Sequence, residues 1–353
     1  MDFVLGGRKI GAGQPVYIVA ELSANHGQSL DRAMELIRIA KQTGADAVKI
    51  QTYTPDTITI NAKQPWFRIG GGTVWDGKTL FDLYQEAYTP WEWHGPLKAE
   101  AEHAGLDFFS SPFDGSAVDF LEDLGVPVYK IASFELVDLP LIRKVAASGK
   151  PLIMSTGMAT LEEISEAVVT ARSAGASQIA LLKCNSGYPA PPGEMNLLTI
   201  PHLAQCFDVP VGLSDHTLGV VAPVMAVALG ACLIEKHLTL SRDEKGPDSG
   251  FSLEPQEFTS MVEAVREAEK MRGTVSYAPT AKESASRAFR RSLFIVVDMR
   301  AGERFTEQNL RSIRPGNGLH TRFYNLALGA RATCDLERGT PLAWEHLIHG
   351  GGV

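Results

Sequence analysis

The sequence predicts a (β/α)₈ TIM barrel followed by a small, mostly β domain. Between residues 16 and 272, short β-rich runs alternate with longer amphipathic runs. Eight β-rich runs occur and a candidate helix follows each, which is the pattern of a (β/α)₈ barrel. A doubly wound open sheet is the alternative, but nothing resembling a glycine-rich phosphate turn follows the first run.

The predicted strands are short and apolar, and helices are expected between them, for example over residues 30–44 and 161–175. In the predicted helix over residues 161–175, the apolar residues lie close to the spacing that lines one buried face. They are Leu161, Ile164, Ala167 and Val168. The strands are expected at residues 16–22, 47–53, 106–113, 128–133, 151–157, 179–185, 209–216 and 232–239.

The connection after the second predicted strand, residues 54–90, is unusually long. It contains Trp66, Trp75 and a run of three glycines at 70–72. Long connections inside compact domains are typically functional loops or lids, and a decorative insertion is the alternative.

The domain boundaries follow from a change in composition after the last predicted helix. The barrel is expected over residues 1–278, a polar linker over 279–291 and the small domain over 292–353. A domain of about 60 residues is close to the lower limit for an independent core, so we expect it to dock on another surface.

Composition excludes several classes of protein. No apolar stretch reaches the ~18 residues that span a bilayer, and the N-terminus lacks the cationic and apolar segments of a secretory signal. The net charge of −8 argues against nucleic acid or an anionic membrane as the main partner. The four cysteines show no CxxC spacing, which favours buried free thiols in a reducing, cytoplasmic setting.

Polar side chains gather at the carboxyl ends of the predicted strands, where TIM barrels place their active sites. Such groups above apolar strands are typical of a substrate pocket. In strand order they are Glu21; Lys49 and Gln51; Ser110 and Ser111; Lys130 and Ser133; Ser155 and Thr156; Asn185 and Ser186; Ser214 and His216; and Glu235 and His237.

The two histidines end neighbouring strands, the seventh and the eighth. Neutral imidazole binds divalent first-row metals, so His216 and His237 are candidate ligands of one ion. Two protein ligands would leave positions for water and a substrate oxygen. Hydrogen-bonded core histidines are the alternative.

Lys49 and Lys130 lie within strands, where a buried ammonium is costly unless it meets an anion. One hypothesis is a Schiff-base lysine, as in class I aldolases. The second is an anion clamp, in which both lysines and nearby serine hydroxyls hold a phosphate and a carboxylate. The third is a set of salt bridges with Glu21, Glu135 or Glu235.

A family resemblance connects these residues. The segments AELSANHG (20–27), KIQTY (49–53), FSSPF (109–113), YKIAS (129–133), STGM (155–158), GLSDHTLG (212–219), EKHLTL (235–240) and GPDS (246–249) resemble the sialic acid synthase family. RPGNG (314–318) resembles the antifreeze-like (SAF) domain of these enzymes. Residues 73–93 and 190–197 are most similar to the pseudaminic acid synthase branch.

The resemblance implies a condensation of phosphoenolpyruvate with an amino-sugar aldehyde and water, giving a nine-carbon 2-keto acid and phosphate. For the pseudaminic branch the aldehyde is open-chain 2,4-diacetamido-2,4,6-trideoxy-L-altrose. N-acetylneuraminate and legionaminic acid synthases, which share the mechanism, are the alternatives. A Schiff-base aldolase and a non-catalytic sugar- or ice-binding protein are more remote ones.

The resemblance also implies roles for individual residues. Glu21 would handle protons or orient a metal-bound water. His216 and His237 would hold the metal, which is expected to be Mn²⁺, with Mg²⁺ or Co²⁺ as alternatives. Phosphoenolpyruvate contacts carry over to Lys49, Ser111, Lys130, Ser133, Ser155 and Ser214, and to Asn185 or Ser186, where CNSGYP (184–189) departs from the family pattern. Sugar contacts carry over to Gln51, Glu135, Tyr188, Asp248 and Arg314. Arg314 would reach the barrel of a partner chain in a domain-swapped homodimer.

Overall fold

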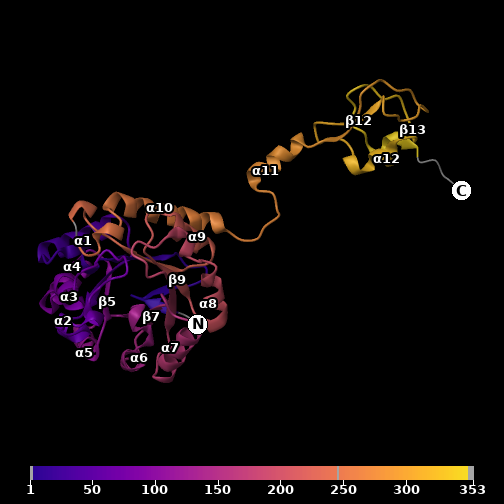
Figure 1. Cartoon of the computed structure of the whole chain (residues 1–353). Helices are drawn as coiled ribbons and strands as arrows, with labels where there is room; N and C mark the ends of the chain where they lie inside the picture. Colours follow the sequence, from indigo (N-terminus) through magenta and orange to yellow (C-terminus); the bar gives the residue numbers. More distant parts are fainter. Residues whose placement is uncertain (1–2, 245, 349–353) are drawn as a thin grey trace. The chain divides into compact units, whose positions relative to one another are not determined.

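The computed structural model describes residues 3–244 and 246–348. The chain forms two compact units, Met1–Gly273 and Thr274–Val353 (Figure 1). No helix among the described residues is long and apolar enough to cross a membrane.

The first unit is a closed barrel of eight parallel strands, which confirms the predicted fold. Each strand lies within one of the eight predicted segments, and β10 pairs with β3 to close the barrel. The strands are β3 (Tyr17–Glu21), β4 (Ala47–Thr52), β5 (Asp107–Pro112), β6 (Tyr129–Ile131), β7 (Leu152–Ser155), β8 (Ile179–Cys184), β9 (Val211–Asp215) and β10 (Leu233–His237).

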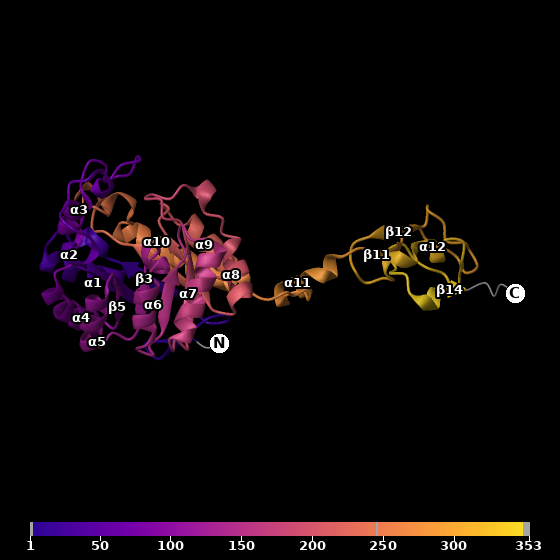
Figure 2. The same ribbon diagram turned by 60° about the horizontal axis from the view of Figure 1, so that its bottom comes forward.

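Helices surround the barrel and alternate with its strands (Figure 2). Several begin at a side chain that caps the first turn; for example, Ser29 and Thr160 accept hydrogen bonds from Arg32 N and Glu163 N. The main helices are α1 (Leu30–Gln42), α4 (His94–His103), α5 (Gly115–Leu124), α6 (Leu139–Ala146), α7 (Leu161–Ser173), α8 (Thr199–Phe207), α9 (Val221–Ala228) and α10 (Pro255–Arg272).

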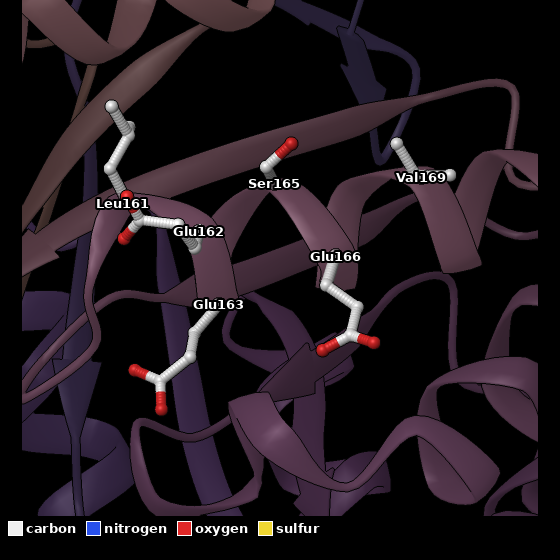
Figure 3. Close-up of a pocket in the computed structure, with 6 residues that line it drawn as sticks. All are labelled: Leu161, Glu162, Glu163, Ser165, Glu166 and Val169. Carbon is white, nitrogen blue, oxygen red and sulfur yellow. The ribbon is translucent and has the colours of Figure 1, made fainter.

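The buried face of α7 differs from the prediction at one position. Ile164, Ala167 and Val168 are buried as predicted, but Leu161 is 44% exposed at the first turn. Figure 3 shows Leu161, Ser165 and Val169 along one side of the helix, with Glu163 and Glu166 on the other. These residues and Glu162 line a surface hollow that contains none of the predicted site residues.

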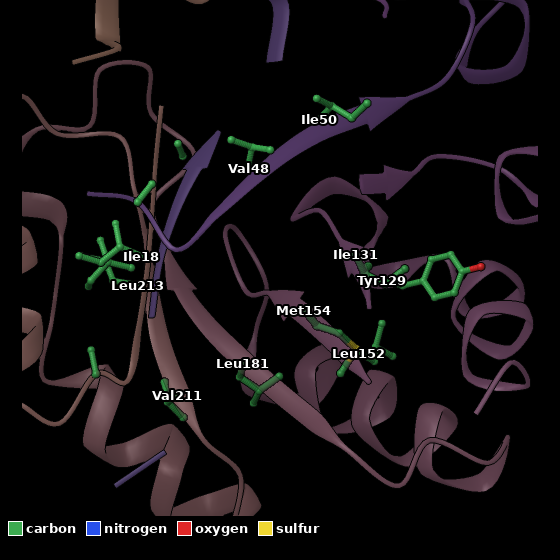
Figure 4. Packing of buried hydrophobic residues seen from close by; sticks show 14 of the residues in the cluster. Ile18, Val48, Ile50, Tyr129, Ile131, Leu152, Met154, Leu181, Val211 and Leu213 are labelled. Carbon is green, nitrogen blue, oxygen red and sulfur yellow. The ribbon is translucent and has the colours of Figure 1, made fainter. Parts of the chain in front are cut away.

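The barrel is held by two apolar layers. The larger lies between the strands and the helices and includes Ile18, Val48, Leu181 and Leu213 (Figure 4). The smaller fills the barrel interior, where Tyr17, Phe109 and Leu182 pack together. The interior apolar residues fill the amino-terminal part of the barrel, and polar side chains occupy the carboxyl ends of the strands.

A short antiparallel hairpin, β1 (Phe3–Leu5) and β2 (Arg8–Ile10), adds to the interior layer. Phe3, Leu5 and Ile10 are buried in the same cluster as Tyr17 and Leu233, the first residues of β3 and β10. The hairpin therefore closes the amino-terminal end of the barrel. Sequence analysis did not predict it, because strands of three residues carry too little periodicity.

The strand register sets the polar side chains at matching heights. Glu21 pairs with His237 of β10 on one side and with Lys49 of β4 on the other. In the same way Ser214 pairs with Glu235. Because side chains alternate along a strand, these residues all point into the barrel interior. They lie near the carboxyl ends of the strands, so they meet at the barrel mouth.

The second unit has its own small core, which includes Leu293, Phe305 and Leu310. Its strands are β11 (Ser292–Ile295), β12 (Leu310–Ile313), β13 (Arg331–Ala332) and β14 (Leu347–Ile348), with the short helix α12 (Tyr324–Ala327). Another helix, α11 (Ala281–Ser286), lies within the segment predicted as a linker, and every residue from 271 to 291 is exposed.

The cysteines differ partly from expectation. All four are free, but Cys206 and Cys334 are exposed, whereas Cys184 and Cys232 are buried as expected.

Candidate active site

Four buried charges lie at the mouth of the barrel. Lys49 Nζ lies 2.5 Å from Glu21 Oε2 and 3.6 Å from Glu235 Oε1, and Lys130 Nζ lies 3.2 Å from the same Glu235 oxygen. Each of the four residues is at most 5% exposed. Glu21 and Glu235 therefore form salt bridges with the two lysines, as the third hypothesis predicts.

Burial and pairing act against each other on the pKa values of this group. Burial raises the pKa of Glu21 above its usual range, against the opposing charge of Lys49. Burial also disfavours the charged form of Glu235, but Lys130 and Lys49 hold its pKa below the usual range. Burial lowers the pKa of Lys130. Two carboxyl groups a few ångströms apart thus differ in proton affinity, which suits Glu21 for proton transfer.

Serine hydroxyls contact members of this charged group. Ser111 Oγ lies 3.4 Å from Lys49 Nζ, and Ser214 Oγ lies 3.3 Å from Glu235 Oε1. The buried Ser155 hydroxyl has no hydrogen-bond partner among the described residues. A buried hydroxyl without a partner is unusual in a folded protein, and it is a feature expected of a ligand-binding site.

Ser133 and Ser186 form a narrower cradle around Gly157. Gly157 N donates to Ser133 Oγ at 3.1 Å. A Cβ atom at this glycine would lie 2.3 Å from Ser186 Oγ and 2.7 Å from Ser133 Oγ, so no larger residue fits without movement. Asn185 is turned away, since its side chain binds Gly187 N and Glu194 O. The structure therefore places Ser186, rather than the amide of Asn185, at the cradle.

His216 and His237 are buried together, with ring centroids 5.3 Å apart. His216 Nδ1 lies 2.7 Å from the Asn185 carbonyl oxygen, which assigns the proton to Nδ1 and leaves Nε2 with its lone pair. His237 Nδ1 is buried without a hydrogen-bond partner among the described residues. Burial and the neighbouring His216 hold the pKa of His237 well below its usual range.

These features fit a divalent metal. The lowered pKa of His237 favours its neutral, metal-binding form, and a backbone carbonyl orients His216, as is usual for metal-bound histidine. Burial alone would lower the pKa of His216, but the neighbouring Cys184 raises it above the usual range. Among residues 3–244 and 246–348, no group of three or more His, Cys, Asp or Glu side chains is arranged to hold an ion. The pair would therefore be the protein's contribution, and the remaining positions would be open to water and substrate.

Three of the predicted sugar contacts border the charged group and the histidines. Gln51 Nε2 donates to Ser23 Oγ at 2.9 Å, and Ser23 in turn donates to Glu21. Asp248 Oδ2 accepts from Ala24 N at 3.1 Å, and burial raises its pKa to about 6. The ring of Tyr188 lies 4.4 Å from that of His216.

Glu135 and Arg314 are the other two predicted sugar contacts. Glu135 is in the 3₁₀ helix Phe134–Val137 after β6, and one of its oxygens is buried without a partner among the described residues. Arg314 belongs to the second unit, where it is exposed and lines a hollow with Arg290, Arg291 and His320.

Sequence analysis missed a buried ion pair formed by the two residues that precede the histidines. Lys236 Nζ lies 2.5 Å from Asp215 Oδ2 and also donates to the Thr217 carbonyl. Asp215 accepts from Thr217 N at 2.9 Å. The pair precedes both histidines in sequence and joins the ends of β9 and β10. A lysine at the centre of the apolar run CLIEKHLT was the signal available.

Glu135 gives a pH-dependent prediction. Burial raises the pKa of Glu135 to about 7, above the ordinary value of about 4.3. Its protonated form therefore stabilises the fold at low pH, and this contribution is lost as the pH rises through about 7. We expect Glu135→Gln to raise the free energy of unfolding by about 1–3 kcal/mol at pH 8.

Urea titrations of Glu135→Gln and wild type between pH 8 and pH 5 would measure this. The difference should shrink as the pH falls. A difference that is absent at pH 8, or constant with pH, would show that Glu135 is not a buried carboxylate with a raised pKa.

Comparisons with known proteins agree with this architecture. The NeuB family profile matches residues 36–277, and the SAF domain profile matches residues 290–348. Pseudaminic acid synthase of Helicobacter pylori is 46% identical over 331 residues, covering 94% of this chain and 97% of that protein. N,N'-diacetyllegionaminic acid synthase of Legionella pneumophila is 36% identical, covering 96% of each.

A solved structure shares the fold. The crystal structure of N-acetylneuraminic acid synthetase from Leptospira borgpetersenii, in complex with citrate, aligns with a TM-score of 0.73 and 32% identity. The alignment covers 81% of this chain and 95% of that one. The match of the family profile to more than half of the chain, together with these relatives, shows that the chain belongs to the NeuB family of nonulosonate synthases, with a C-terminal SAF domain.

Proposed function

We propose that this protein is a pseudaminic acid synthase. It would condense phosphoenolpyruvate with 2,4-diacetamido-2,4,6-trideoxy-L-altrose and water, and release pseudaminic acid and phosphate. The observation that carries the reaction class is the buried set of two lysines, hydroxyls and two histidines at one barrel mouth. The choice of sugar is supported by the 46% identity to the Helicobacter pylori enzyme.

The side chains suit the two charged groups of phosphoenolpyruvate. Lys49 and Lys130 would meet its phosphate and carboxylate, with hydrogen bonds from Ser111, Ser155 and Ser214. The cradle of Ser133 and Ser186 would hold phosphate oxygens, because small hydroxyls donate hydrogen bonds to anions. Asn185 would act through its carbonyl oxygen, which orients His216.

The bonds that form and break balance as follows. C3 of phosphoenolpyruvate bonds to the aldehyde carbon, and the aldehyde oxygen gains a proton. Water adds to C2, and the C2–O bond to phosphate then breaks as the 2-keto group forms. One proton of the water is transferred to the new hydroxyl and the other leaves with phosphate.

Glu21 would carry these protons, because its raised pKa and its contact with Lys49 allow both protonation states. A divalent metal on His216 and His237, Mn²⁺ or alternatively Mg²⁺ or Co²⁺, would polarise the aldehyde oxygen. Gln51, Glu135, Tyr188 and Asp248 would bind the sugar.

Phosphate release from phosphoenolpyruvate tests the function directly. The panel contains the 6-deoxy-diacetamido-altrose, the 2,4-diacetamido-6-deoxy-mannose sugar and N-acetylmannosamine, each with and without a chelator. The proposal predicts chelator-sensitive release with the altrose sugar alone. Release with another sugar would assign a different branch of the family, and a Schiff base trapped by borohydride with pyruvate would assign an aldolase.

Metal should strengthen phosphoenolpyruvate binding. Glu21 and Glu235 oppose the positive charges of Lys49 and Lys130 in this pocket, so the pocket alone does not neutralise a ligand with at least two negative charges. Since charges a few ångströms apart interact by several kcal/mol even at moderate dielectric, we expect affinity at least about tenfold lower with chelator. Isothermal titration calorimetry with and without Mn²⁺ would measure it. Equal affinities would contradict the placement of the ion beside the anion.

We further propose that Arg314 completes the sugar site of a partner chain in a swapped homodimer. Residues 274–353 contain 11 of the 33 basic and 7 of the 41 acidic residues, so this part carries a net charge of +4 and the rest −12. Opposite net charges favour association of residues 274–353 of one chain with the barrel of another.

Subunit mixing would test the swapped dimer. His216→Ala and Arg314→Ala chains, each inactive alone, should regain activity when refolded together, because one barrel of the hybrid has intact histidines and receives an intact arginine. Absence of regained activity in a verified hybrid, or a strict monomer in light scattering at micromolar concentration, would contradict the proposal.

A further inference from the structure

Within the connection between β4 and α4, the segment of residues 70–77 presents one tryptophan inward. Between Gly70 and Gly77, Trp75 is the only residue that is not exposed. Ile69 N donates to Lys78 O at 2.9 Å and Gly77 N donates to Ile69 O at 3.0 Å, which closes the segment as a hairpin. The local sequence thus builds an ordered support for a single side chain.

Asp76 fixes the tip of this hairpin. Its carboxylate accepts from Gly72 N and Thr73 N, both at 2.9 Å, and from Thr73 Oγ1 at 2.7 Å. Gly71 and Gly72 have φ values of 99° and 85°, which residues with a side chain rarely adopt. The glycine run therefore serves the turn that positions Trp75.

Trp75 joins an aromatic cluster above the histidines. Its indole Nε1 donates to the Pro247 carbonyl at 2.8 Å, and its ring lies 5.4 Å from Tyr188 and 6.4 Å from Phe251. Tyr188 lies 4.4 Å from His216, and Phe251 lies 5.0 Å from His237. Three loops, following β4, β8 and β10, thus meet in one apolar wall beside the metal ligands.

We propose that Trp75 and Phe251 form the wall that receives the C6 methyl group of the sugar and disfavours a hydroxyl there. This inference rests on the proposed function. With the aldehyde carbon at the histidines, the opposite end of the six-carbon chain would lie against these rings, because they are joined to the histidines through Tyr188 and Phe251. A C6 hydroxyl at this wall would lose water, and the Pro247 carbonyl beside it already accepts from the Trp75 indole.

The size of the expected discrimination follows from the chemistry. An apolar wall rejects an added hydroxyl by roughly 10–100-fold in kcat/KM, since the hydroxyl is desolvated without a full partner. A binding site built from hydrogen-bond donors would instead favour the hydroxylated sugar. A preference for the 6-deoxy sugar would therefore indicate an apolar wall, and a preference for the 6-hydroxy sugar a hydrogen-bonding one.

The test compares two sugars that differ in one atom: 2,4-diacetamido-2,4,6-trideoxy-L-altrose and the same sugar with a hydroxyl at C6. Wild type is expected to prefer the 6-deoxy sugar by roughly 10–100-fold in kcat/KM. Trp75→Ala should reduce this preference to a few-fold while the KM for phosphoenolpyruvate stays unchanged, and Trp75→Phe should retain most of it. Trp66→Ala is the matched control, because Trp66 lies on the same connection and is 74% exposed.

Two outcomes would overturn the inference alone: a wild type without preference between the two altrose sugars, or a Trp75→Ala variant that loses rate equally with both. In the second case Trp75 would only support the loop, and the Trp75→Ala variant would show a lowered melting temperature. Turnover of N-acetylmannosamine with neither altrose sugar would instead contradict the proposed function, and the inference with it.

Discussion

Replacing His216 with alanine is expected to lower turnover by about 10³-fold and to leave the barrel folded, because metal polarisation of a carbonyl contributes several kcal/mol. The variant loses one of two imidazoles that are available to the ion. Its structural cost is modest: the Asn185 carbonyl loses one hydrogen bond, worth about 1 kcal/mol. Phosphate release, Mn²⁺ affinity by calorimetry and a thermal melt would be measured on the same sample.

His103→Ala is the matched control for this prediction. His103 ends α4 and is exposed, so its loss should change neither metal affinity nor rate. If His216→Ala retained a near-normal rate, or lost rate with unchanged metal affinity, the assignment of His216 as a ligand would be wrong.

Replacing Lys236 with methionine is expected to destabilise the barrel by about 3–5 kcal/mol, the usual cost of breaking a buried ion pair by removing one partner. Both Lys236 and Asp215 have fully buried side chains. The variant leaves the Asp215 carboxylate buried with hydrogen bonds from Thr217 alone. Because the pair adjoins both histidines, metal affinity should fall as well.

Urea unfolding monitored by tryptophan fluorescence would measure the loss. The double variant Lys236→Met with Asp215→Leu should recover most of the stability, since an apolar pair of similar volume is often as stable as a buried ion pair. A single variant within about 1 kcal/mol of wild type would show that Lys236 is not held as a charged partner.

The barrel was predictable because each strand is a dense apolar run bounded by turn residues, and helix-period segments separate the runs. The β1–β2 hairpin was not, since three residues are too few for a period to appear. Leu161 was predicted to be buried, but it is the first residue of α7 and lies at the end of the helix, where it stays exposed.

The strand ends predicted which side chains meet at the barrel mouth, but not the partners of each. Register brings Lys49 beside Glu21, yet whether a lysine pairs with one or two carboxylates depends on side-chain reach. The choice between Asn185 and Ser186 depended on the path of the loop after β8. Trp75 could not be placed, because its anchor is a carbonyl at Pro247, far away in sequence.

The most direct test is one competitive incubation. Phosphoenolpyruvate, Mn²⁺ and equal amounts of the 6-deoxy-diacetamido-altrose, the 6-deoxy-diacetamido-mannose sugar and N-acetylmannosamine are mixed with the full-length protein, and the products are identified by mass spectrometry and NMR. We predict a single nine-carbon 2-keto acid, pseudaminic acid, and none when a chelator is present. N-acetylneuraminate or a legionaminic acid as the main product, or equal product with chelator, would contradict the proposed function.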